Sequence, residues 1–150
     1  MRLQVKMWAM GLLVTSWTWA TTSTAREIEP APKAKVQAKK DQCRREAPSK
    51  KAWVTVLADG RNAFVAKLEL APGAKVPKHR DATEETIHVL EGSGTIVIDG
   101  KTSKVSPGTT IFMPANAEVS FENGPTKMVG VQVFAGPGPA KKYAKWGKCQ

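Results

Sequence analysis

Short segments in which apolar and polar residues alternate run through residues 52–134 and constrain the fold of this chain most. Such alternation indicates β-strands with one buried face. Turn pairs such as Asp59-Gly60 and Asp99-Gly100 separate the segments. About eight short strands with frequent turns and no helical period predict an all-β sandwich or barrel. The predicted strands cover residues 52–58, 62–70, 84–90, 94–98, 101–105, 109–113, 117–121 and 127–134.

Three chemistry-bearing side chains, His79, Asp81 and Glu85, form a cluster: the first two lie between predicted strands 62–70 and 84–90, and Glu85 lies at the start of the second of these strands. In an extended backbone residues two apart share a face, so His79 and Asp81 are predicted to point the same way. Within residues 84–90, Glu85 has the parity of the Ile and Val residues and therefore points inward, whereas His88 points outward. Because a buried carboxylate needs a partner and two carboxylates repel each other, a positive group is expected between Asp81 and Glu85.

The spacing of this cluster resembles the first motif of the cupin superfamily. Gly73, His79, Glu85 and Gly92 stand at the family spacing, and Asp81 stands where most members carry a second His. The resemblance covers roughly residues 52–138. It implies a double-stranded β-helix, or jelly-roll barrel, with His79 and Glu85 as metal ligands and Asp81 as a substitute ligand.

A later segment resembles the second cupin motif, with Pro107, Gly108, Pro114 and Asn123 in place. Val119 stands where the family carries its last metal-binding His and cannot be a ligand. Strand parity directs the side chains of this region into one cavity, so an apolar pocket wall is predicted beside the polar cluster. The predicted wall consists of Val119, Phe121, Ile111 and Met113.

Three interpretations of the cluster stay open at this stage. The first is a divalent metal centre for Mn, Fe, Zn or Ni that binds or acts on a small oxygenated ligand. The second is a metal-free acid/base site with His79 as the base; it would need an acid such as Tyr, and Tyr143 lies in the C-terminal tail. The third is a structural remnant in a ligand-binding or interaction module without metal.

The two ends of the chain differ from the predicted barrel in composition. Residues 1–25 combine early basic residues, a short apolar run and a small-residue cleavage site, which predicts a signal peptide and a periplasmic or secreted protein; an uncleaved anchor is the alternative. Residues 26–51 and 139–150 carry most of the formal net charge of +10 and are expected to be flexible basic tails. The aromatic residues of the C-terminal tail, Tyr143 and Trp146, are expected to pin it to the barrel or to a second subunit.

The two cysteines, Cys43 and Cys149, lie in these tails. In an oxidising compartment an even number of cysteines favours one intrachain disulfide. Intermolecular bridges and free thiols are the alternatives.

Composition also limits the partners that we expect. A small-molecule ligand follows from the cavity, and a homodimer from the resemblance to cupins. The basic tails suggest weak contact with an anionic surface. Specific nucleic-acid binding is not expected, because no aromatic residues interleave with the charges of residues 26–51.

Overall fold

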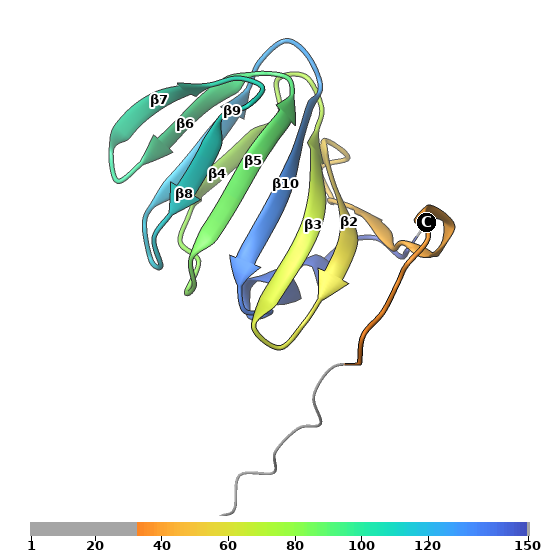
Figure 1. Cartoon of the computed structure of the whole chain (residues 1–150). Coiled ribbons are helices and arrows are strands. Elements are labelled where there is room, and N and C mark those ends of the chain that lie inside the picture. Colours follow the sequence, from red (N-terminus) through yellow and green to blue (C-terminus); the bar gives the residue numbers. More distant parts are fainter. Residues whose placement is uncertain (1–32, 150) are drawn as a thin grey trace, which may run out of the picture. The chain divides into compact units, whose positions relative to one another are not determined.

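Two antiparallel sheets form the fold in the computed structural model, which describes residues 33–149 (Figure 1). The predicted signal peptide, residues 1–25, lies outside the described residues. The strands are β1 (Arg44–Glu46), β2 (Ala52–Asp59), β3 (Ala63–Leu70), β4 (Lys75–His79), β5 (Glu85–Glu91), β6 (Gly94–Ile98), β7 (Lys101–Val105), β8 (Thr110–Met113), β9 (Val119–Asn123) and β10 (Met128–Ala135). Two short 3-10 helices, η1 (Lys39–Asp41) and η2 (Pro139–Lys145), complete the described elements.

The larger sheet has the strand order β1-β2-β3-β10-β5-β8, and the smaller sheet has the order β4-β9-β6-β7. Strands far apart in sequence become neighbours, because β10 pairs with β3 on one side and with β5 on the other. The predicted jelly-roll architecture is confirmed. Every strand predicted from the alternation is present, with shifts of a few residues at most at its ends.

Two of the observed strands were not predicted, and both are sheet edges. β1 pairs with β2, so the larger sheet begins within residues 26–51, the segment that was expected to be a flexible basic tail. β4 pairs with β9 and contains Pro77, which is tolerated because an edge strand leaves backbone donors unpaired. His79 is the last residue of β4, so this edge strand positions the candidate site.

The core lies between the inner faces of the two sheets. Its largest fully buried side chains are Val54, Leu70, Val89, Met128 and Phe134. Burial alternates along the strands, as in β8, where Ile111 and Met113 are buried and their neighbours are exposed. Each fully buried side chain of this size stabilises the fold by about 1.5 to 3 kcal/mol.

Two residues of the cupin-like motifs have structural roles. Gly92 adopts φ 80°, and a Cβ atom there would lie 2.5 Å from the carbonyl oxygen of Lys127, so only glycine fits. The Asn123 side-chain amide donates hydrogen bonds to the carbonyl oxygens of Ala71 and Thr126 at 2.7 and 2.9 Å. It therefore joins the segment that follows β3 to the turn between β9 and β10.

The C-terminal segment 139–149, which we call the C-terminal strap, folds onto the barrel. Tyr143 is only 5% exposed, and its ring packs near Phe64, Phe134 and the edge of Trp146. The expected anchoring by Tyr143 and Trp146 is therefore confirmed, and the part expected to be a flexible tail is instead folded from Pro139 to Lys145. In Figure 1 the strap is the dark blue segment that ends beside the orange residues near β1.

The intrachain disulfide is present. Cys43, just before β1, is bonded to Cys149 in the strap, with the two Cα atoms 4.8 Å apart. The backbone N–H of Gly147 also donates to the carbonyl oxygen of Glu46 at 2.9 Å. Both ends of the described chain are thus joined to each other at the edge of the larger sheet.

Among the described residues, no helix has the length and apolarity required to cross a bilayer.

Candidate metal centre and cavity

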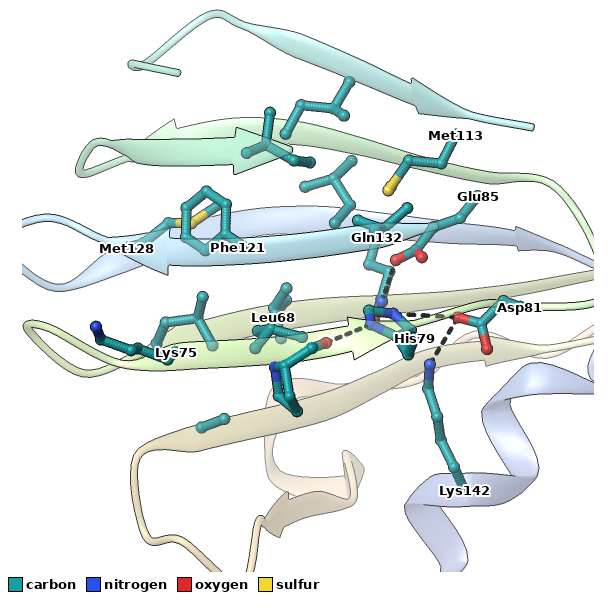
Figure 2. A pocket seen from close by; sticks show the side chains of 18 of the residues that line it. Leu68, Lys75, His79, Asp81, Glu85, Met113, Phe121, Met128, Gln132 and Lys142 are labelled. Carbon is teal, nitrogen blue, oxygen red and sulfur yellow. Dashed lines mark hydrogen bonds and ion pairs between the residues drawn. The ribbon is translucent and has the colours of Figure 1, made fainter. Parts of the chain in front are cut away.

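The three predicted ligands come together at one end of the space between the sheets. His79 ends β4, Asp81 lies in the connection that follows, and Glu85 is the first residue of β5. One donor atom from each of them lies within 4.8 Å of the others. Figure 2 shows the three side chains directed toward a common point. Their metal-binding role remains a prediction.

The His79 ring is oriented by the backbone. Its Nδ1 atom lies 2.9 Å from the carbonyl oxygen of Pro77, which can only accept, so Nδ1 carries the hydrogen. Its Nε2 atom lies 3.7 Å from Oδ2 of Asp81. Nε2 is therefore the ring nitrogen that faces the carboxylates, which is the arrangement that a metal-ligating imidazole requires.

Asp81 is paired with a residue of the C-terminal strap. The Nζ atom of Lys142 lies 2.8 Å from Asp81 Oδ2, and the side chains of Lys142 and Asp81 are 37% and 16% exposed. The expected positive group is thus present in the protein itself. In Figure 2 the Lys142 side chain extends from the C-terminal strap toward the carboxylate of Asp81.

Glu85 is buried, with 6% of its surface exposed, and its carboxylate accepts a hydrogen bond from the side-chain amide of Gln132. The carbonyl oxygen of the same amide accepts a hydrogen bond of 3.0 Å from the hydroxyl of Tyr143. Burial raises the pKa of Glu85, while Gln132 and the charge of Lys142 favour its ionised form. Burial likewise raises the pKa of Tyr143, so this hydroxyl is a hydrogen-bond donor at neutral pH.

The donor set suits a divalent metal ion. One imidazole nitrogen and two carboxylates are ligands that Mn, Fe, Zn and Ni accept, and such a set leaves coordination positions for water or a ligand. Ligand atoms about 2.0 to 2.2 Å from one ion lie roughly 3 to 4 Å apart, so the spacing of up to 4.8 Å requires only small side-chain rotations. The residues therefore fit the metal that the motif resemblance implies.

A cavity of about 510 Å³ extends from this polar end between the two sheets. Its wall is mainly apolar and includes the four residues of the predicted pocket wall, Val119, Phe121, Ile111 and Met113, together with Leu68 and Met128. Val119 pairs with His79 across β9 and β4, so an apolar side chain occupies the position opposite the imidazole. The cavity thus combines one polar end with a long apolar body (Figure 2).

Sequence reasoning missed three residues of this site: Gln132, Lys142 and Tyr143. Gln132 could have been found, because it has the inward parity of Met128 and Phe134 on β10. The strap residues carry no such signal. The argument that Tyr143 lies away from the pocket was wrong, since its hydroxyl reaches the partner of Glu85.

The outward direction predicted for His88 agrees with the structure. Its side chain is exposed, and its Nδ1 atom lies 2.9 Å from the hydroxyl of Thr110 on β8. His88 therefore belongs to the outer face of the larger sheet and takes no part in the cluster.

Comparisons with known proteins agree with this architecture. The family model described as a cupin domain matches residues 66–132, a range that contains His79, Asp81, Glu85, Val119 and Gln132. A solved RmlC-like cupin from Shewanella frigidimarina superposes with a TM-score of 0.62 at 17% identity, covering 69% of this chain and 92% of that chain. The polyketide cyclase RemF from Streptomyces resistomycificus superposes with a TM-score of 0.59 at 27% identity, covering 68% and 79%.

One curated relative has a named activity. The dimethylsulfoniopropionate lyase DddW of Ruegeria pomeroyi is 31% identical over 77 residues, which are 49% of this chain and 51% of the lyase. The chain thus spans about half the length of the curated relative it matches.

Proposed function

Because this chain belongs to the cupin superfamily, we propose that its barrel holds a divalent transition metal with His79, Asp81 and Glu85 and acts there on a small oxygenated molecule. The observation that carries the proposal is the convergence of one imidazole nitrogen and two carboxylates, within 4.8 Å, at the polar end of an apolar cavity. When bound, such an ion supplies Lewis-acid activation of a ligand oxygen.

The residues of the site have separate tasks in this proposal. The Pro77 carbonyl holds the His79 ring with Nε2 toward the ligand. Gln132 holds Glu85 in place and favours its ionised form against the effect of burial, and the Tyr143 hydroxyl keeps the amide of Gln132 in the orientation that donates to Glu85. The apolar wall excludes water and selects a ligand with an apolar body and an oxygen-bearing head group.

The reaction class that we propose is a lyase reaction, because the curated relative is a dimethylsulfoniopropionate lyase. Proton NMR of dimethylsulfoniopropionate incubated with the metal-loaded protein follows whether the compound is consumed. Consumption that disappears in Glu85→Gln supports the reaction class. If the compound is consumed no faster than in buffer without protein, the proposed reaction class is wrong, and the metal proposal is unaffected.

Metal analysis by mass spectrometry of protein purified without a His tag tests the metal proposal directly. We expect about one equivalent of a transition metal per chain, lost in His79→Ala and in Glu85→Gln. The chain offers matched controls, since His88 and Glu84 are exposed residues of the same types. His88→Ala and Glu84→Gln should keep the metal. A metal-free wild-type protein that also takes up no added metal would contradict the proposal.

A metal-free binding module is the second candidate, and one observation favours it. The Lys142 ammonium already neutralises Asp81 at 2.8 Å, so the cluster has a cation without any metal. In that case ligand affinity should be unchanged by His79→Ala and by added chelator.

We also propose that the protein works after export, in the periplasm or outside the cell. The Cys43–Cys149 disulfide supports this placement, because structural disulfides persist in oxidising compartments. Alkaline phosphatase fused behind residues 1–25 should become active outside the cytoplasm. A fusion without phosphatase activity outside the cytoplasm would contradict export.

A further inference from the structure

Lys142 forms an ion pair with Asp81, one of the three proposed metal ligands. Its Nζ atom is 2.8 Å from Oδ2 of Asp81, the carboxylate oxygen that also faces Nε2 of His79 at 3.7 Å. We propose that Lys142 is a tethered internal cation that competes with a metal ion for Asp81, so that metal binding is coupled to docking of the C-terminal strap. This inference rests on the proposed metal site.

The strap holds Lys142 close to the site. Its neighbour Tyr143 is buried and hydrogen-bonded to Gln132, and Cys149 ties the end of the strap to Cys43. Within the 3-10 helix, buried Ala140 lies before Lys142 and buried Tyr143 lies after it, so the helix is anchored on both sides of the lysine. A group tethered in this way acts at a high effective concentration, so it competes with a free ion far better than dissolved ammonium would.

The surroundings keep the ammonium near the site. Its Nζ atom lies 5.0 Å from the centre of the Phe134 ring and 5.6 Å from that of Tyr143, distances at which aromatic faces attract a cation. The charged and polar groups that face it are Asp81, then Glu85, His79 and Gln132 across the polar end of the cavity. A metal ion that binds Asp81 therefore lies close to the Lys142 ammonium. The ion is either repelled by this charge or displaces it.

Two like charges within a few ångströms repel strongly where water is partly excluded. Metal binding therefore separates Lys142 from Asp81 and weakens one of the attachments of the strap. By linkage, a strap that is held more tightly lowers the metal affinity by the same factor.

Titration of the disulfide-bonded protein with Mn²⁺ and with Zn²⁺ at fixed pH tests the competition. Lys142→Met, which removes the charge and keeps an apolar side chain of similar length, should bind either metal at least about tenfold more tightly than the wild type. Lys142→Arg keeps the charge and should stay near the wild type. Lys141→Met is the matched control, because Lys141 is exposed on the same helix. Equal affinities for Lys142→Met and Lys141→Met would overturn the inference.

Hydrogen exchange of the wild-type protein gives a second measurement that needs no variant. Saturating metal should speed exchange at the Lys141 and Trp146 amides of the strap, which donate to the carbonyl oxygens of Gly138 and Tyr143. The Val89 amide in the core, bonded to Thr109, should be unchanged. Strap exchange that stays the same or slows with metal would overturn the coupling.

The results separate the two proposals. If the wild type binds metal and Lys142→Met binds it equally, the inference is wrong and the metal site stands. If only Lys142→Met binds metal, the inference is supported and the wild-type cluster is a metal-free site. If neither protein binds metal, both proposals are wrong.

Discussion

The hydroxyl of Tyr143 donates a 3.0 Å hydrogen bond to the side-chain oxygen of Gln132, and the same amide donates to Glu85. A residue of the C-terminal strap is thereby linked to the most buried member of the candidate metal centre. All three side chains are almost fully buried. The strap is therefore part of the site rather than an appendage of the barrel.

Tyr143→Phe should lower the free energy of unfolding by about 1 to 2 kcal/mol, because the buried oxygen of Gln132 loses its donor. The ring contacts with Phe134 and Trp146 are kept in this variant. Urea denaturation followed by circular dichroism measures the change. An unchanged free energy would mean that Gln132 finds another donor.

Replacement of the disulfide in Cys43→Ser/Cys149→Ser should destabilise the protein by roughly 4 to 5 kcal/mol in the loop-entropy model, since the bond joins residues separated by 106 positions. Urea denaturation of this variant and of reduced wild type should agree. Peptide mapping without reductant should recover Cys43 linked to Cys149 of the same chain. Disulfide-linked dimers, or equal stability of the variant, would contradict the intrachain role.

Val119→His should restore a nitrogen ligand opposite His79, because the two residues are paired across β4 and β9 and Val119 lines the cavity. We expect metal affinity to rise by about tenfold or more, which corresponds to roughly 1.4 kcal/mol. Competition with a fluorescent metal indicator measures it. Ser120→His on the same strand is the control, since Ser120 is not part of this cavity. A gain no larger than that of the control would show that position 119 cannot reach the ion.

Glu69 should make stability dependent on pH in the acid range. Although burial opposes ionisation, Lys127 at 2.7 Å and Lys67 at 3.2 Å lower the pKa of Glu69 from 4.5 to about 2. Because the pKa is lowered in the folded state, the stabilisation is complete above pH 4.5 and is lost as the pH falls toward 2. Glu69→Gln should therefore cost on the order of 2 to 3 kcal/mol at pH 7 and much less at pH 2.

Thermal and urea unfolding of the wild type and Glu69→Gln between pH 7 and pH 2 measure this difference. Glu122→Gln is the control, because its ion pair with Lys75 is well exposed and should contribute under about 1 kcal/mol. A difference between wild type and Glu69→Gln that does not shrink with falling pH would contradict the assignment.

The interior strands could be predicted because each of them has one face in the core, which imposes alternation on the sequence. The same rule predicted that Glu85 points inward and His88 outward. β1 and β4 escaped prediction because neither has a fully buried residue, whereas the edge strands β7 and β8, which were predicted, bury Val105, Ile111 and Met113. The residues of β1 and β4 are therefore free of the alternating pattern.

The sequence by itself determined the eight strands that alternate in polarity, the turns between them and the inward direction of Glu85, since strand parity and turn chemistry are local properties. Only the tertiary structure decided which cation faces Asp81 and which side chain holds Glu85. Lys142 is 61 residues from Asp81, and Gln132 is 47 residues from Glu85. Contacts over such separations depend on how the strap and β10 dock, and no local pattern of residues encodes that docking.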